Sequence, residues 1–393
     1  MTTLLDQHRL LEALALAESA IGITEPNPRV GCVIGTQGGQ VLGRGATQQA
    51  GGPHAELMAL RDASAQGLGV RGATAWVTLE PCAHHGRTPP CCDALVAAGL
   101  ARVVVALQDP YPQVAGAGIA RMRAAGVQVD LADSNIAQAA WELNIGFFSR
   151  VLRKRPWVRV KVAASLDGRT ALDNGHSQWI TGAAARTDGH AWRKRASAVL
   201  TGIGTVLADD PRLDVRLVPS NWQPLRVVLD SALRTPPTAR LLRPPGRVLL
   251  VSALPSVVGK TVPSEADHVE WANIRDEASG RVDLSRLLDE LACRGVNELH
   301  VEAGSALNGA LLEAGLVDEW LVYLAPKFLG TGHGMVAFSQ LTHLDQAVAL
   351  EVVETGLFGP DLRIRLRAQG GGFTRRPRTG APSASSTASL TPK

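Results

Sequence analysis

The first 150 residues alternate between segments with helical and with strand-like spacing of apolar positions. Apolar residues recur every three to four positions in four segments, which predict helices at 4–20, 55–66, 91–99 and 118–126. Alternating or continuous β-branched and apolar residues predict strands at 29–35, 40–45, 73–79, 102–107 and 127–131, the first two as a hairpin. A long amphipathic helix over roughly 135–153 follows. This alternation is typical of a layered α/β domain.

A second α/β unit begins after "RKRPW" at 153–157, which combines charge, proline and an aromatic residue just before a new strand at 158–166. Further strands are predicted at 225–230, 247–253, 298–304, 319–326 and 361–367, with a helix at 284–295. Beyond Ala368 the chain is rich in Gly, Ser, Thr and Pro and offers little to bury. We therefore expect domains at 1–153 and 154–368 and a disordered basic tail at 369–393, because 393 residues exceed what one core usually organises.

Composition narrows the class of protein. Hydrophobic residues make up 45% and charged residues 19%, which argues against a disordered or disulfide-stapled chain. The net charge of +4 equals that of the acid-free tail, so the rest is neutral and predicts no nucleic-acid-binding face. The odd count of 5 cysteines and the absence of a secretion-signal pattern predict a cytoplasmic protein. No apolar run approaches the roughly 20 residues of a membrane span.

The segments "HAE" at 54–56 and "EPCAHHGRTPPCC" at 80–92 predict a catalytic zinc site. His54, Cys82 and Cys91 supply three nitrogen and sulfur ligands and leave a fourth position open for water. Glu56 is then free to move protons between that water, whose pKa zinc lowers to about 7, and a leaving amine. Zinc deaminases share this pattern, although here eight residues rather than two separate the cysteines.

Other histidines and cysteines in the sequence offer alternative assignments for the zinc ligands. Cys92 is an alternative to Cys91, but Cys91 is expected at a helix N-terminus, where the helix dipole favours a thiolate. A closed site completed by His84 or His85 would be structural and would leave Glu56 without a task. Cys32 and Cys293 are expected to be core residues.

Longer motifs resemble one known family across roughly residues 4–368. "PNPRVGCVI", "AGGPHAELMAL", "TLEPCAHHGRTPPCCDALVAAG" and "QDPYPQVAGAG" resemble the deaminase half of the bifunctional riboflavin-biosynthesis deaminase/reductases. "KVAASLDGRTA", "SQWITG", "TVLADDP" and "VEAGSALNGALLEAGLVDE" resemble the reductase half. The resemblance implies a cytidine-deaminase-like three-layer domain followed by a dihydrofolate-reductase-like α/β domain.

The resemblance also implies the reactions. The small-molecule substrate would be 2,5-diamino-6-(5-phosphoribosylamino)pyrimidin-4-one, deaminated with Zn²⁺ and then reduced by NADPH to 5-amino-6-(5-phosphoribitylamino)uracil. The family's zinc ligands and proton shuttle fall on His54, Cys82, Cys91 and Glu56, in agreement with the interpretation above. Asn27 falls where the family holds the pyrimidine, and His84, His85 and Arg87 fall in the loop expected to cover it.

The reductase half shows no GxGxxG after its first strand, so an ordinary dinucleotide-binding fingerprint is not indicated. Backbone amides at Gly304, Ser305 and Ala306 are candidates to bind a phosphate where a helix opens. The resemblance implies cofactor contacts at Ala163, Trp179, Thr205, Asp209, Ser231, Gly304, Ser305, Ala306, Leu307, Asn308, Gly309 and Ala310. It implies substrate-phosphate contacts at Ser177, Arg193, Leu213, Arg216 and Glu302.

Two reductase residues are candidates for chemistry, and some assignments stay open. Lys161 alternates with Val160 and Val162, so it either enters a cleft and polarises the sugar or lies on an edge strand. Asp209 is a candidate catalytic or cofactor-side acid. Arg193 and Arg216 bind phosphate or are solvated surface charges.

The alternative function is a nucleic-acid or nucleoside deaminase whose second domain only binds a regulatory ligand. The neutral charge outside the tail and the intact "SLDGRTA" and "TVLADDP" motifs argue against it. We expect no nucleic-acid or membrane partner, and a homo-oligomer whose size the sequence does not give.

Overall fold

The computed structural model describes residues 2–83, 89–111, 115–243, 245–254, 267–369 and 373. Its first part is a five-stranded sheet in the order β2-β1-β3-β4-β5. The strands are β1 (Gly31–Gly35), β2 (Val41–Ala46), β3 (Thr74–Val77), β4 (Arg102–Val105) and β5 (Gln128–Leu131). Strand β1 is antiparallel to β2 and β3, whereas β3, β4 and β5 are parallel.

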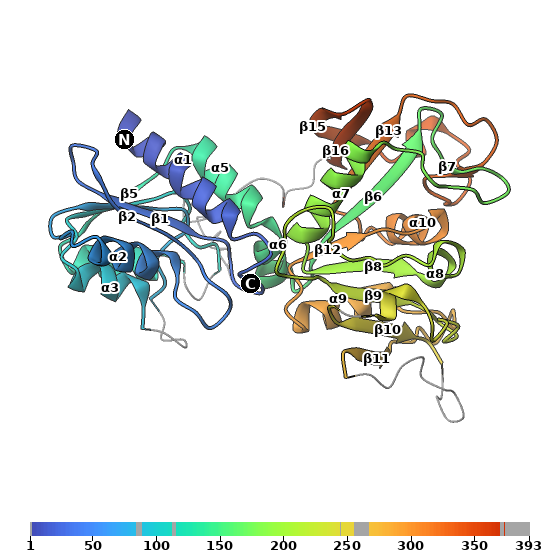
Figure 1. Cartoon of the computed structure of the whole chain (residues 1–393), viewed down its shortest axis with the longest axis horizontal. Helices are drawn as coiled ribbons and strands as arrows, with labels where there is room; N and C mark the ends of the chain where they lie inside the picture. The colour runs from blue at the N-terminus through green and yellow to red at the C-terminus, as the bar shows by residue number, and fades with distance from the viewer. Residues whose placement is uncertain are drawn as a thin grey trace, which may run out of the picture.

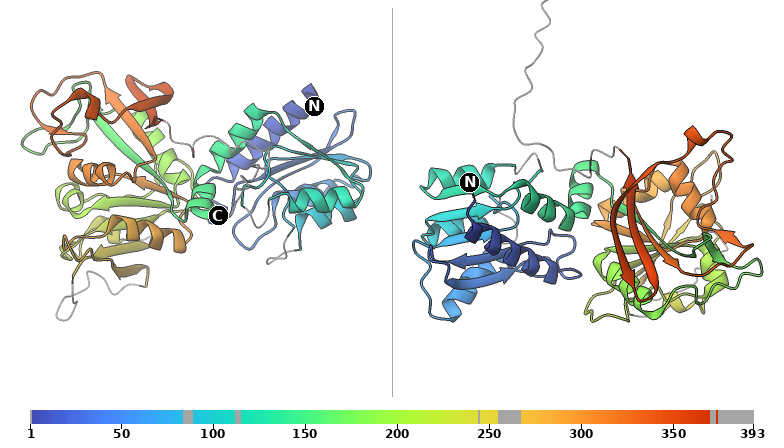
Figure 2. Two further views of the ribbon diagram at one scale, coloured as in Figure 1. Left: turned by 180° about the vertical axis from the view of Figure 1, so that it is seen from behind. Right: turned by 90° about the horizontal axis from the view of Figure 1, so that it is seen from above.

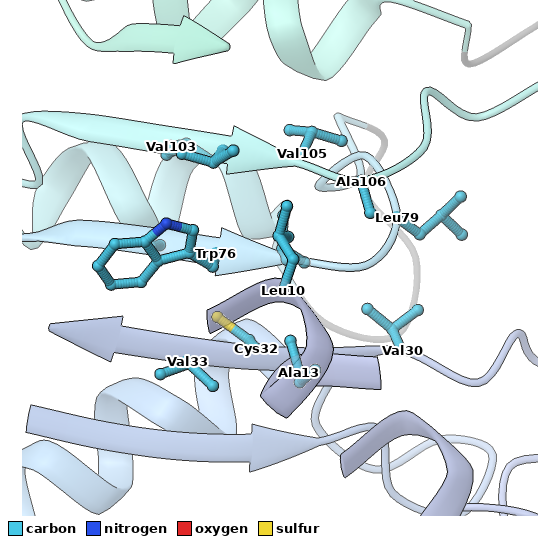
Figure 3. Close-up of a cluster of buried hydrophobic side chains, with 14 of the residues drawn as sticks. Leu10, Ala13, Val30, Cys32, Val33, Trp76, Leu79, Val103, Val105 and Ala106 are labelled. Carbon is cyan, nitrogen blue, oxygen red and sulfur yellow. The ribbon is translucent and has the colours of Figure 1, made fainter. Parts of the chain in front are cut away.

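Helices cover both faces of this sheet. Helices α1 (Leu4–Ser19) and α5 (Ser134–Leu143) lie side by side on one face, and α2 (Ala55–Ala65) and α3 (Cys91–Ala97) lie on the other (Figure 1). Helix α4 (Ala117–Ala124) packs beside α3. Leu10 and Ala13 of α1 meet Cys32 and Trp76 of the sheet in a core without solvent access (Figure 3). The predicted three-layer domain is confirmed.

The second part is a nine-stranded sheet in the order β11-β10-β9-β8-β12-β6-β13-β16-β15. Its strands are β6 (Trp157–Ser165), β8 (Ala198–Gly202), β9 (Leu225–Leu229), β10 (Val248–Ser252), β11 (Val269–Asn273), β12 (Glu298–Val301), β13 (Glu319–Ala325), β15 (Leu350–Phe358) and β16 (Asp361–Ala368). The seven strands from β11 to β13 are parallel, and β16 and β15 continue antiparallel. Strands β7 (Arg169–Ala171) and β14 (His333–Gly334) form a separate pair.

Four α-helices accompany the second sheet (Figures 1 and 2): α7 (Ala183–Arg195), α8 (Ile203–Asp209), α9 (Leu284–Cys293) and α10 (Ser305–Glu313). A 3₁₀ turn, η2 (Arg240–Leu242), precedes β10, and another, η3 (Leu344–Gln346), precedes β15. Helix α8 starts directly after β8, and α10 starts a short loop after β12, so the amino ends of both helices lie at the carboxyl edge of the parallel strands. Ligands of open α/β sheets bind at this edge.

The predicted helix over 135–153 is wrong as one element. Helix α5 ends at Leu143, a short α6 (Ile145–Phe148) follows, and Ser149–Arg153 form a π-helical turn, η1. Asn144 interrupts the helix because its side-chain amide pairs with both backbone groups of Arg29, accepting from N at 2.8 Å and donating to O at 2.9 Å. The spacing of apolar residues over 135–153 gives no information about Arg29, so it could not predict this interruption.

Helix α7 (Ala183–Arg195) and strands β8, β11 and β15 were not predicted from the sequence. Helix α7 is largely polar and buries only Ala185, Gly189 and His190, so its apolar stripe is narrow. Strand β15 is an edge strand that is mostly exposed or half-buried, so it lacks a clear alternation. These elements are held by neighbours distant in the sequence.

Two further expectations are corrected. Cys32 is buried as predicted, but Cys293 is exposed, because it lies off the stripe of Leu287, Leu288 and Leu291 that buries α9. Phe373 lies in the tail that was expected to bury little, yet its ring centroid is 5.4 Å from that of Trp141 and 6.1 Å from that of Trp157. The Arg153 guanidinium lies 4.2 Å from the centre of the Phe373 ring. The other tail residues from 370 onward lie outside the described part.

Buried ion pairs join the two parts. Glu298 of β12 accepts from Arg29, Arg159 and Arg195 at 2.8–2.9 Å. A second carboxylate, Glu319 of β13, pairs with Arg159, Arg365 and Arg367, and Arg367 returns to Glu142 of α5 at 2.7 Å. Among the described helices, none has the length and apolar composition needed to cross a membrane.

Candidate functional sites

His54, Cys82 and Cys91 meet at one end of the first sheet. His54 caps α2, Cys82 follows β3, and Cys91 is the first residue of α3, as expected. The His54 Nδ1 atom lies 3.7 Å from the Cys82 sulfur and 3.3 Å from the Cys91 sulfur. Donor atoms of a tetrahedral zinc site stand about 3.5–3.8 Å apart, given the usual zinc–ligand bond lengths. The three residues therefore fit a zinc ion in both donor type and spacing.

Two local features position these ligands. A β-carbon on Gly45 of β2 would lie 2.2 Å from the Ala55 carbonyl oxygen, so only glycine lets the start of α2 approach the sheet this closely. Glu80 is buried beside the cysteine loop and accepts backbone N–H bonds from Asp109, Gly116 and Ile119 at 3.0–3.2 Å. The loop that carries Cys82 is thereby tied to α4.

Glu56 lies two residues from His54 and is 3% exposed. Burial, together with the nearby Cys82 sulfur, raises the pKa of Glu56 to about 7. Hydrogen bonding to the Cys91 thiol and to His54 lowers the pKa of Cys82 to about 4, and the same bond to Cys82 raises the pKa of Cys91. A zinc ion would take both sulfurs as thiolates.

The structure describes two of the other residues predicted near the zinc site, Cys92 and Asn27. Cys92 has no solvent access and belongs to the hydrophobic core, with its sulfur 3.6 Å from the Asp93 carboxylate, and it is not grouped with the three donors, which favours Cys91 as the ligand. Asn27 is half-buried at the junction of the two parts, beside Arg29, Asn297 and Glu298, in a crevice with no room for a water molecule. The predictions for His84, His85 and Arg87 lie outside the described residues.

A second cluster lies in the reductase-like part. Arg193 of α7 forms a two-pronged ion pair with Glu302, which follows β12, and donates to the Asp214 carbonyl at 2.9 Å. Lys161 of β6 places its Nζ 3.8 Å from Glu302. Arg193 and Lys161 hold the pKa of Glu302 well below its usual range despite burial, whereas burial, helped by Arg193, lowers the pKa of Lys161. Because β6 lies between β12 and β13, the edge-strand alternative for Lys161 is wrong.

Sequence reasoning missed two members of this cluster. His190 accepts from the Arg216 backbone N–H at 3.2 Å, and burial, with Arg193 and Arg216 nearby, lowers its pKa to about 4. Asp214 accepts from the Arg216 guanidinium at 2.6 Å. Neither lies in a motif that indicated chemistry. Leu213 is buried at a positive φ of 53°, a backbone strain that is common at functional sites.

Other predicted residues lie near the carboxyl edge of the sheet. The Ser177 hydroxyl donates to Asp209 at 3.3 Å, which joins the loop after β7 to the end of α8. Trp179 is 62% exposed, with the Arg186 guanidinium 4.5 Å from its ring centre. The remaining cofactor candidates beside the strand ends are half-buried, namely Ala163, Thr205 and Ser231.

The predicted loop from Gly304 to Ala310 divides into two parts. Gly304 caps α10, and it and Ala306 are exposed, whereas Ser305, Leu307 and Ala310 are half-buried. Asn308 and Gly309 are buried instead: Asn308 donates to the Met335 carbonyl at 3.0 Å, and a β-carbon on Gly309 would lie 1.6 Å from the Ala337 carbonyl oxygen. These two residues pack α10 against the chain at 335–337.

Comparison with known proteins covers almost the whole chain. Residues 5–107 match the family model for the cytidine and deoxycytidylate deaminase zinc-binding region, and residues 156–364 match that for the RibD C-terminal domain. The riboflavin biosynthesis protein RibD of Escherichia coli is 43% identical over 92% of this chain and 99% of its own length. Its Haemophilus influenzae counterpart is 42% identical over 91% and 96%.

Solved structures agree over both domains. Acinetobacter baumannii RibD is similar with a TM-score of 0.82 at 40% identity, covering 93% of this chain and 99% of that one. A Thermotoga maritima diaminohydroxyphosphoribosylaminopyrimidine deaminase/5-amino-6-(5-phosphoribosylamino)uracil reductase gives 0.83 at 32% identity with the same coverage. With both domains present in the same order, the chain belongs to the RibD family of bifunctional deaminase/reductases of riboflavin biosynthesis.

Proposed function

We propose that this chain deaminates 2,5-diamino-6-(5-phosphoribosylamino)pyrimidin-4-one in residues 1–153 and reduces the ribosyl group of the product in residues 154–368. The final product is 5-amino-6-(5-phosphoribitylamino)uracil. The observation that carries the proposal is the set of His54, Cys82 and Cys91 donors beside the buried Glu56, in a chain that matches RibD relatives over both domains. Family membership favours a second enzyme over a regulatory second domain.

The deamination step exchanges a ring amine for oxygen. When bound, zinc supplies a Lewis acid that makes water a competent nucleophile at neutral pH. Glu56 would accept a proton from the attacking water and deliver it to the amine, which leaves as ammonia. Burial excludes bulk water from Glu56, so its protons exchange with the reactants. Asn27 and the predicted covering residues His84 and Arg87 are proposed to bind the pyrimidine.

The reduction step needs the sugar carbon held against the nicotinamide of NADPH, which supplies the hydride. Arg193 and Arg216, with Ser177, Leu213 and Glu302, are proposed to hold the substrate phosphate side, since guanidinium groups donate paired hydrogen bonds to phosphate oxygens. Lys161 is proposed to polarise the sugar because its ammonium is half-buried beside Glu302. Asp209 is proposed as an acid on the cofactor side, next to Ser177.

The cofactor would lie along the carboxyl edge of the parallel strands. Ala163, Trp179, Thr205 and Ser231 are proposed contacts, together with the loop from Gly304 to Ala310. The N-terminus of α10 at Gly304 supports a phosphate contact there, because no described side chain caps its first backbone N–H groups and the space beside Gly304 is open. Asn308 and Gly309 would act by packing α10 in place.

One assay with a matched variant tests both steps. The purified chain is incubated with the diaminopyrimidine phosphate, with and without NADPH, and the products are identified by mass. Deaminated product alone is expected without NADPH, and the ribityl product with it. Glu56→Gln should keep zinc and lose deamination by about 100- to 10,000-fold. The same variant should still reduce supplied deaminated intermediate, and failure on that intermediate would mean that the two activities are not separable.

The location, oligomeric state and partners of the enzyme are also part of the proposal. A small-molecule substrate is part of the function above. We propose further that the enzyme acts in the cytoplasm as a homo-oligomer, without a nucleic-acid or membrane partner. Light scattering of the purified chain measures the oligomeric state.

A further inference from the structure

A cavity of about 160 Å³ lies in the reductase domain beside the cluster around Arg193 and Glu302, and it shares only Asp214 with that cluster. Four of its lining residues are arginines, and the set is Arg212, Asp214, Arg226, Arg240, Arg243 and Pro245. Arg226 is the second residue of β9, so it lies at the amino end of that strand, whereas Ser231 follows its carboxyl end. Arg193, Arg216 and Glu302 do not line the cavity.

The positive charge of this cavity is not neutralised within the described part of the chain. Its one acid, Asp214, is buried and already accepts from Arg212 at 2.7 Å and from Arg216 at 2.6 Å. Within the same described residues, the side chains of Arg240 and Arg243 make no hydrogen bond or ion pair. No described residue therefore supplies a counterion to these two charges at the cavity.

Arg226 is a buried guanidinium in the same cavity. It is 2% exposed, and its terminal nitrogens donate to the carbonyls of Arg243, Pro245 and Gly246 at 2.7–2.9 Å. Its Nε atom has no hydrogen-bond acceptor among the residues that the structure describes. Burial, with the nearby Arg212 charge, lowers the pKa of Arg226, while Asp214 opposes that effect. One buried and two exposed arginines that line the same cavity favour an anion within it.

We propose that this cavity binds a phosphate group, as inorganic phosphate or as a phosphate monoester, at a site separate from the reductase substrate pocket. Phosphate offers several oxygens to planar guanidinium donors and carries close to two negative charges at neutral pH. The volume is below the 300 Å³ or so at which drug-sized ligand pockets begin, so only the phosphate group of a larger ligand enters.

The site is tested by isothermal titration of the full-length protein with inorganic phosphate at low salt. The double variant Arg240→Gln/Arg243→Gln removes two exposed charges without disturbing a hydrogen bond of the described structure, so it is expected to fold and to weaken phosphate binding at least tenfold or so. Arg281→Gln removes an exposed arginine elsewhere on the same domain and should leave the affinity unchanged. Thermal unfolding of each variant confirms that it is folded.

A second pair of measurements separates this site from the reductase pocket and identifies the source of the phosphate. Arg193→Gln removes a proposed substrate contact and should retain the phosphate binding that the double variant loses. If ribose 5-phosphate displaces inorganic phosphate and ribose does not, the site binds phosphate monoesters. If inorganic phosphate binds and ribose 5-phosphate does not displace it, the site binds the free ion. Binding lost in Arg193→Gln and kept in the double variant would overturn the proposal, as would equal binding in all variants.

Discussion

Arg29, in the loop before β1, donates a 2.8 Å hydrogen bond to Glu298 of β12, a residue 269 positions away, and both side chains are at most 4% exposed. The same guanidinium donates to the Arg195 carbonyl at 2.7 Å and to Glu25 at 3.0 Å. The contact with Glu298 is buried and the other two are partly buried, so Arg29 ties the deaminase domain to the reductase domain through an interface of low dielectric constant.

Replacing Arg29 should destabilise the protein strongly. Arg29→Met leaves Glu298 and Glu25 buried with fewer cationic partners, which typically costs about 3–5 kcal/mol. Urea unfolding followed by circular dichroism measures the loss. Arg44→Gln is the matched control, because its ion pair with Glu12 is exposed on the arginine side, at 49%, and should contribute about 1 kcal/mol or less. Equal effects of the two variants would mean that the buried network contributes no more than a surface pair.

Acid should weaken the same network. Burial opposes the charge on Glu298 and Glu319, but their arginine partners outweigh it and hold the pKa of each below its usual range. A depressed carboxyl pKa contributes stability above the unfolded value of about 4.3, and this stability is lost as pH falls below it. Unfolding free energy should therefore fall below about pH 4 by up to about 1.4 kcal/mol per pH unit for each group. Glu298→Gln should flatten this slope, whereas Glu277→Gln, at an 85% exposed side chain, should not.

Zinc content should follow the three grouped donors. Alanine at His54, Cys82 or Cys91 should abolish a content of about one zinc per chain, since each removes one of three protein ligands. Cys92→Ser should keep the metal because Cys92 belongs to the hydrophobic core. Elemental analysis of the purified variants checks this. Zinc lost from Cys92→Ser and retained in Cys91→Ala would reverse the assignment.

The reductase pocket predicts a separation of kinetic effects. Arg216→Ala should raise KM for the deaminated intermediate with little change in KM for NADPH, because a charged hydrogen bond to phosphate contributes about 1.5–3 kcal/mol. Asp209→Asn should lower kcat at saturating substrate instead. Arg193→Ala should also lower the melting temperature, because Glu302 would lose its two-pronged partner. Arginine variants that weaken NADPH and leave the substrate KM unchanged would place the arginines on the cofactor.

Because Phe373 packs on the folded part, we expect the stability of a truncated chain to depend on whether it keeps this residue. A chain ending at Ala368 loses the ring that packs on Trp141 and Trp157, at an expected cost of about 1–2 kcal/mol for a half-buried aromatic. A chain ending at Phe373 should match the full-length protein, because the remaining segment has little to bury. Thermal unfolding compares the three proteins. Identical melting temperatures would show that the aromatic contact adds nothing measurable.

Features that depend on short-range chemistry could be predicted from the order of the residues alone. The zinc donors could be predicted because each lies in a compact motif next to a helix or strand boundary, and Cys91 was separated from Cys92 by the expected helix start. Buried parallel strands such as β10 were visible as apolar runs. Lys161 was visible as a polar residue alternating with buried valines.

Tertiary structure alone decided the features built from distant residues. Asn144 ends α5 because it pairs with the backbone of Arg29, 115 residues away, and no local pattern contains that partner. Glu298 and Glu319 are tolerated in buried strands only because arginines from other elements reach them. Phe373 packs against the core of the first domain, and the polar residues around it in the sequence do not predict this contact. Long-range packing and charge pairing outweigh local propensity at these positions, since burying a charge or ending a helix is favourable only when the partner is in place.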